Sequence, residues 1–110
     1  MTENEKLISN LVIQSLDNIY LASEKVAKSM EVQWVNTGYL YAIIQKSKQP
    51  VKAVPALMIR HNRKFNILIA KIMAVCKNKA VEIGANHVPL QFLKNCIEIV
   101  KKAYLEGVEN

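Results

Sequence analysis

One short stretch of the chain combines residue types that could bind a polyanion. Residues 59–65 read I-R-H-N-R-K-F, which brings Arg60, Arg63 and Lys64 close together in the sequence. Guanidinium groups bind phosphate through paired hydrogen bonds, and each Lys or Arg near a phosphate releases counterions. At about 100° per residue in a helix, these side chains and Lys71 share one side, opposite an apolar arc. The pattern predicts a basic helix face that contacts a phosphate backbone.

The net charge of +6 is concentrated in the middle of the chain. Residues 1–31 carry −2 and residues 82–110 carry −1, whereas residues 32–81 contain nine bases and no Asp or Glu. A solvated surface normally mixes both signs, so an unmixed basic block indicates that a partner supplies the negative charge. The remaining bases of this block, which we also expect to contact nucleic acid, are Lys46, Lys48, Lys52, Lys77 and Lys79.

Other side chains near the basic block have chemistry that suits nucleic acid. His61 falls about 100° from the first arginine, at the edge of the basic face, where it would contact phosphate when protonated. Trp34 and Tyr39 are candidates for stacking on unpaired bases. Aromatic residues at helical spacing are more often core residues, and Tyr41 beside Ile44 fits that interpretation.

Residues suited to catalysis or metal binding are sparse. The chain has two histidines and one aspartate, and it has no zinc-protease, hydrolase, Walker or dinucleotide-binding motif. Cys76 and Cys96 lack the Cys-x-x-Cys spacing, so we expect them to be reduced core thiols. The sequence therefore predicts a protein that is not an enzyme and that uses no metal and no cofactor.

Apolar residues recur at the helical period through most of the chain, and we expect helices over about 3–30, 38–47, 55–83 and 88–106. Thr2 and Glu5 form a capping box for the first helix, and Thr37 caps the second. Gly84 and Gly107 are expected to end the third and fourth helices.

Pro55 and Pro89 suit the first turns of the third and fourth expected helices. No segment alternates as a strand does, and we find no internal repeat. These patterns predict an all-α fold: a small single-domain helical bundle over residues 1–110, with three long helices and one short helix.

The leading functional hypothesis is a non-enzymatic nucleic-acid-binding helical protein. Single-stranded RNA or DNA is the favoured ligand, with duplex as a second option, and so small a chain would act as a subunit of a ribonucleoprotein or nucleoprotein complex. Small helical subunits of CRISPR effector complexes are similar in size and charge, although no motif of that family is present. A helix-turn-helix is a sub-case, although the connector over residues 47–55 is longer than its usual turn.

The alternative hypothesis is a structural or interaction protein. Such a protein would be a coat or assembly subunit, a homo-oligomer, or an inhibitor that docks on an acidic protein surface. The sequence contains no apolar run near the ~20 residues that span a bilayer. Its N-terminus, MTENEKLISN, does not resemble a signal peptide, so we expect a cytoplasmic protein without a membrane partner.

Overall fold

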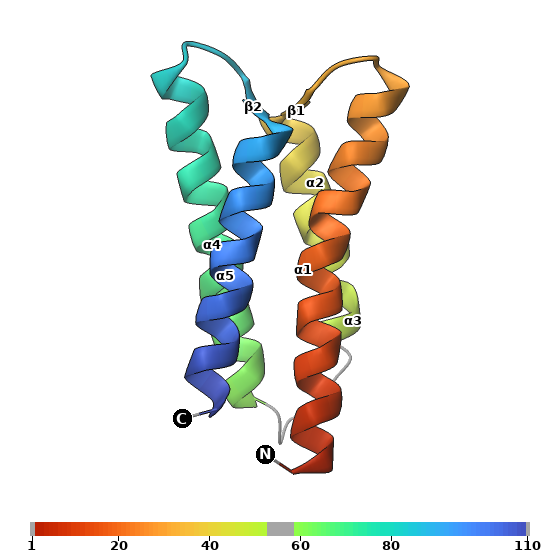
Figure 1. Cartoon of the computed structure of the whole chain (residues 1–110), viewed down its shortest axis with the longest axis vertical. Coiled ribbons are helices and arrows are strands. Elements are labelled where there is room, and N and C mark those ends of the chain that lie inside the picture. The colour runs from red at the N-terminus through yellow and green to blue at the C-terminus, as the bar shows by residue number, and fades with distance from the viewer. Residues whose placement is uncertain (1, 53–58, 110) are drawn as a thin grey trace.

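The chain folds into two helical hairpins that meet through a pair of very short strands (Figure 1). The computed structural model describes residues 2–52 and 59–109. The elements, in chain order, are α1 (Glu3–Ser29), β1 (Trp34–Asn36), α2 (Thr37–Ser47), α3 (Gln49–Lys52), α4 (Ile59–Glu82), β2 (His87–Pro89) and α5 (Leu90–Glu109). The predicted all-α class is confirmed, with three long helices and one short helix, to which the single turn α3 is added.

The predicted capping signals position α1 and α4. The Thr2 hydroxyl accepts a hydrogen bond from the Glu5 backbone N–H at 3.1 Å, as the capping box requires. Gly84 has φ 68° and follows the end of α4, as expected for a left-handed cap. The Ala85 N–H reaches the carbonyl of Ala80 at 2.8 Å, which satisfies an acceptor that the helix end leaves open.

Several predicted boundaries are shifted by one to three residues. Asn36, and not Thr37, is the N-cap of α2, and its side chain accepts from the Gly38 N–H at 2.7 Å. Pro89 ends β2 and precedes α5, so it does not lie in the first turn of that helix as predicted. Gly107 does not end α5 as predicted, because the helix continues to Glu109. The predicted role of residue 55 lies outside the described residues.

The two strands were not predicted. They pair antiparallel, with Trp34 opposite Pro89 and Val35 opposite Val88. Both central valines are buried, whereas their neighbours are half-buried. A three-residue strand contains too little alternation to be recognised in a sequence, and its partner is more than fifty residues away.

The two halves of the chain repeat one helix–strand–helix unit, contrary to our expectation of no internal repeat. Each position in the first half corresponds to the position 53 residues later, as the pairing of Val35 with Val88 indicates. The flanking hydrogen bonds obey the same rule: the Thr37 N–H donates to the Asn86 carbonyl at 2.9 Å, and the Leu90 N–H donates to the Gln33 carbonyl at 3.0 Å. A pseudo-two-fold axis therefore passes between the paired strands.

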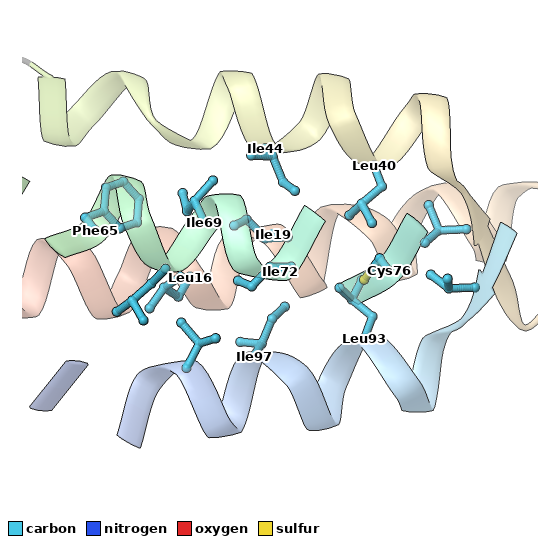
Figure 2. Close-up of a cluster of buried hydrophobic side chains, with 14 of the residues drawn as sticks. Leu16, Ile19, Leu40, Ile44, Phe65, Ile69, Ile72, Cys76, Leu93 and Ile97 are labelled. Carbon is cyan, nitrogen blue, oxygen red and sulfur yellow. The ribbon is translucent and has the colours of Figure 1, made fainter. Parts of the chain in front are cut away.

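The core obeys the same correspondence. Buried residues of α1, α2 and α3 match buried residues of α4 and α5 in the pairs Val12/Phe65, Leu16/Ile69, Ile19/Ile72, Ala27/Ala80, Leu40/Leu93, Ile44/Ile97 and Val51/Tyr104. Figure 2 shows side chains from α1, α2, α4 and α5 meeting in one cluster. Four of these seven pairs are identical residues, but they are dispersed among positions that differ, which is why the repeat is hard to see in the sequence.

Burial tests the assignment of single residues to the core. Phe65 is fully buried, whereas Tyr41 is 53% exposed, so the assignment of Tyr41 to the core was wrong. Cys76 and Cys96 are free thiols. Burial raises the pKa of Cys76 to about 12, which makes it a poor nucleophile at neutral pH.

Candidate nucleic-acid interface

The bases of α4 do not form one continuous stripe. Arg63 and Lys71 are exposed on its outer side, as predicted, but Ile67 lies between them and is 58% exposed. The Lys64 side chain is half-buried, and its ammonium end occupies the space that a Cβ on Gly107 would fill. That position places the positive charge at the carboxyl end of α5, where the helix dipole favours it. The outer side of α4 is thus a mixture of basic and apolar residues.

A groove between α2 and α4 brings two of the predicted bases together. Lys48 and Lys77 both line this α2–α4 groove, which has a volume of about 370 Å³. Tyr41 and Gln45 line it from α2, and Met73 lines it from α4. The tyrosine and the glutamine were not predicted as site residues. Their i, i+4, i+7 spacing with Lys48 was the available signal, because it places all three on one side of a helix.

Other predicted bases point elsewhere. Lys46 lines a separate groove with Asn18 of α1. Lys79 lies 3.5 Å from a carboxylate oxygen of Glu82 and 5.4 Å from the centre of the Phe92 ring. The side chains of residues 52 and 60, which were also predicted to bind, lie outside the described residues.

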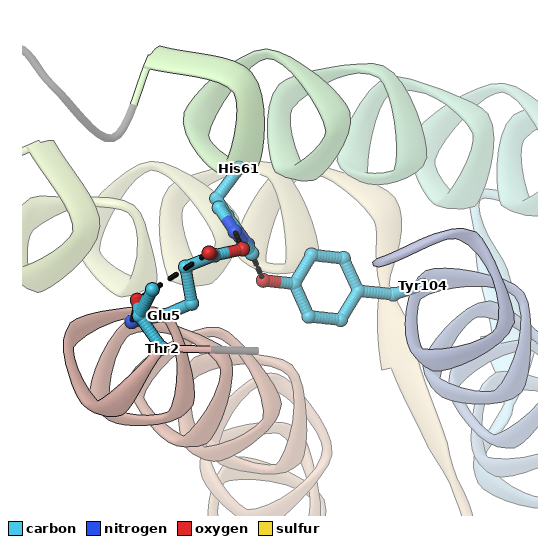
Figure 3. Close-up of polar contacts among 4 residues, drawn as sticks. All are labelled: Thr2, Glu5, His61 and Tyr104. Atoms are coloured by element: carbon cyan, nitrogen blue, oxygen red, sulfur yellow. Dashed lines mark hydrogen bonds and ion pairs between the residues drawn. The ribbon is translucent and has the colours of Figure 1, made fainter. Parts of the chain in front are cut away.

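His61 is not at the surface, so its predicted position at the edge of a phosphate-binding face was wrong. It is 2% exposed, and its Nδ1 lies 2.8 Å from the Tyr104 hydroxyl (Figure 3). Its Nε2 lies 3.4 Å from a Glu5 carboxylate oxygen. Because a carboxylate only accepts hydrogen bonds, we assign the donor to Nε2 and the acceptor to Nδ1. The histidine therefore ties the start of α4 to α1 and α5.

The same contacts act on the carboxylate. The hydrogen bond from His61, followed by one from the Thr2 backbone, holds the pKa of Glu5 below its ordinary value. Both contacts favour the ionised form of the carboxylate. This cluster therefore stabilises the packing of three helices and contributes no group to an exposed binding surface.

The two aromatic residues predicted to stack on bases have different surroundings. Trp34 is half-buried, and its ring stacks on the His87 ring with centroids 4.2 Å apart across the strand pair. One face of that indole is thus already covered. Tyr39 is 53% exposed, but it is not among the residues that line the α2–α4 groove. Tyr41, at the same exposure, does line it.

The pseudo-two-fold axis relates the α2–α4 groove to a second groove between α1 and α5. This α1–α5 groove is lined by Asp17, Tyr20, Leu21, Lys94, Ile97 and Glu98, and every one of these positions is 53 residues from a residue of the α2–α4 groove. Its volume is only about 180 Å³. The equivalence makes the two sites a matched pair with different side chains.

The charges of the two grooves differ. At the α1–α5 groove, Lys101 donates to Asp17 at 2.8 Å and lies 3.5 Å from Glu98. The hydrogen bond to Asp17 raises the pKa of Lys101. The acids and bases of this groove therefore neutralise one another. The α2–α4 groove has two lysines, Lys48 and Lys77, and no acidic residue in its lining.

The remaining observations add no other site. Within residues 2–52 and 59–109, no cluster of side chains is suited to hold a metal ion. No helix in that part of the chain combines the length and apolar character needed to cross a membrane. No protein-family model matches the sequence, and no curated protein or solved structure is significantly similar to it.

Proposed function

We propose that this protein binds nucleic acid without catalysing a reaction, through phosphate contacts along α2 and α4. The observation that carries the proposal is that the two units, although equivalent in fold, differ in how their charged residues are distributed. The segment that contains α2 and most of α4, residues 32–81, has nine bases and no acid, whereas the pseudo-equivalent helices α1 and α5 mix both signs. Because the core needs no such separation, an external polyanion is the simplest reason for it.

The exposed bases lie along a path that suits an extended backbone. Arg63 precedes Ala70, a groove residue, by seven positions, which is about two turns and the same side of α4. Lys77 lies seven positions after Ala70, and Lys48 lines the same groove from the end of α2. Lys71 is exposed on the adjoining side of the same helix. Basic side chains so placed would contact successive phosphates without reading a base sequence.

The size and charge of the chain also suit a subunit of a ribonucleoprotein or nucleoprotein complex. A small number of phosphate contacts gives weak binding at physiological salt, because non-specific affinity depends on the number of counterions released. Neighbouring subunits on the same nucleic acid would supply the remaining affinity by raising the effective concentration. We therefore propose assembly with further protein chains and a location in the cytoplasm.

The direct test is a titration of labelled single-stranded RNA, single-stranded DNA and duplex DNA, followed by fluorescence anisotropy. Four phosphate contacts to a single strand predict a loss of affinity of about 50-fold between 50 and 200 mM salt. The variant Arg63→Glu with Lys71→Glu should weaken binding strongly. Because both residues are exposed, its free energy of unfolding should change by less than about 1 kcal/mol.

A matched control variant changes the net charge by the same amount on the other helices. Lys25 of α1 and Lys102 of α5 are both exposed, and Lys25→Glu with Lys102→Glu should weaken binding much less. Equal losses in the two variants would mean that only net charge matters and that α4 is not the contact surface. No binding at 50 mM salt would refute the proposed function itself.

One observation favours a second candidate function, docking on an acidic protein surface. Ile67 and Val81 are 58% and 80% exposed on α4. Such apolar side chains form no favourable contact with a nucleic-acid backbone, but they are typical of protein-binding surfaces. An apolar contact would resist salt, whereas phosphate contacts would not. Retention of a protein partner at high salt, abolished by Ile67→Ser, would favour this candidate.

A further inference from the structure

We propose that the α2–α4 groove holds one unstacked base of a single-stranded nucleic acid, with the base lying on the Tyr41 ring. This inference rests on the proposed function. It adds a defined site, a preference for single strands, and a contact through an uncharged residue, Tyr41. It requires a ring that is accessible, a space that admits a base, and positive charge at the rims for the adjacent phosphates. The groove has all three.

The Tyr41 ring is accessible to a ligand, although a residue one turn further along the same helix is buried. Its side chain is 53% exposed although Ile44, one turn away, is 1% exposed. Among residues 2–52 and 59–109, the Tyr41 ring makes no aromatic contact and its hydroxyl makes no hydrogen bond. An exposed ring beside lysines is the arrangement by which single-strand-binding proteins stack successive bases.

The space beside the ring results from small residues on α4. Ala70 and Ala74, one turn apart, line the groove, whereas Asp17 and Leu21 occupy the equivalent positions of the α1–α5 groove. The smaller side chains accompany a volume of about 370 Å³, against about 180 Å³ in the equivalent groove. The larger volume falls within the roughly 300–1,000 Å³ of sites that accept small organic groups, and the smaller one does not.

The floor and the rims of the groove suit the two parts of a nucleotide. The floor includes Ile69 and Met73, and a methionine thioether adapts its shape to a flat polarizable ring. Lys48 and Lys77 at the rims would contact the phosphates on either side of the base. Gln45 presents an amide that both donates and accepts hydrogen bonds, so it can meet the edge of any base.

The pseudo-equivalent groove shows why only one of the two sites would bind. Lys94 stands where Tyr41 stands in the other unit, so the α1–α5 groove has no ring at that position. Its acidic residues, Asp17 and Glu98, already pair with Lys101 and would repel phosphate. We therefore expect one base-binding groove per chain.

The test compares two tyrosines of α2 that are equally exposed. Tyr41→Leu should weaken binding to single-stranded RNA and DNA about 10-fold, because a leucine cannot stack on a base. Tyr39→Leu, the matched control, should leave the affinity unchanged, since that ring lies outside the groove lining. Tyr41→Phe keeps the ring and should bind as the natural protein does. None of these variants should alter the affinity for duplex DNA, in which the bases remain stacked.

Two further variants separate this inference from the proposed function. Ala74→Leu introduces the side chain found at the equivalent position of the smaller groove, and it should weaken single-strand binding without affecting duplex binding. Lys48→Gln with Lys77→Gln should reduce the slope of log affinity against log salt by about 1.4, whereas Tyr41→Leu should leave that slope unchanged.

The outcomes are distinguishable. Salt-dependent binding by the natural protein, with Tyr41→Leu and Tyr39→Leu equally active, would overturn the base-stacking site and leave the proposed function standing. Equal losses for single strands and duplex in Tyr41→Leu would overturn it as well, because stacking requires an unpaired base. No binding of any nucleic acid at low salt would overturn both.

Discussion

The turn that follows α1 has a residue in an unfavourable backbone conformation, and one substitution there should stabilise the fold. Glu31 has φ 57°, a left-handed conformation, and it corresponds under the 53-residue rule to Gly84, which has φ 68°. The two turns form the same hydrogen bonds: the Val32 N–H reaches the Ala27 carbonyl at 3.0 Å, just as in the turn after α4. A side chain in this conformation destabilises the folded state by about 1–2 kcal/mol. Glycine removes this strain, but it lowers the stability by about 0.4–1 kcal/mol because it increases the entropy of the unfolded chain. We therefore expect Glu31→Gly to stabilise the fold by roughly 0.5–1 kcal/mol.

Urea unfolding followed by circular dichroism measures this change directly. Glu31→Ala is the control, because it removes the charge beside the carboxyl end of α1 but keeps a side chain in the left-handed conformation. Gly84→Ala should have the opposite effect, a loss of about 0.5–1 kcal/mol, since an added Cβ there meets no atom within 4 Å and only the backbone is strained. If Glu31→Gly were no more stable than Glu31→Ala, the conformational argument would be refuted.

Two further predictions concern the buried histidine cluster. Tyr104→Phe should cost about 1–3 kcal/mol in unfolding free energy, because it leaves Nδ1 of the buried His61 without its donor, whereas Tyr41→Phe at an exposed site should cost almost nothing. The pKa of Glu5 is lowered in the folded state, so its stabilisation is fully present above the unfolded pKa of about 4.3 and is lost as the pH falls through the folded value. Glu5→Gln should therefore be less stable at pH 6 and should show a flatter loss of stability below about pH 4.5; parallel curves for the two proteins would contradict this.

The helices were predictable because each has local signals that repeat. The apolar stripe of α1 extends over many turns, and Thr2 and Glu5 mark its start. Gly84 marks the end of α4 because a left-handed residue there is least costly for glycine. These signals involve neighbours a few residues apart, so they require no knowledge of the tertiary structure.

The features that the sequence analysis missed depend on contacts between distant segments. The strands exist because Val35 meets Val88, and neither three-residue stretch favours a strand by itself. His61 lies at the margin of the apolar arc, where the helical wheel does not distinguish surface from core; its burial depends on Tyr104 from another helix. The helical wheel likewise could not show that Tyr41 faces α4. It gives the angle of each side chain around its own helix, but not which other helix lies on that side.

The pseudo-two-fold relation adds a physical reason to attach meaning to the charge pattern. Equivalent positions of the two units have the same backbone surroundings, so the fold places similar demands on them, and the core pairs Ile19/Ile72 and Ile44/Ile97 are identical. At two positions of the α2–α4 groove, by contrast, Ala70 and Lys77 stand where the first unit has Asp17 and Glu24. These side chains lie at the surface, where packing does not dictate their type. The exclusion of acids from one of two structurally equivalent surfaces is therefore not a requirement of folding. The proposed polyanionic ligand at α2 and α4 would account for the direction of the difference, because only that surface would have to contact phosphate.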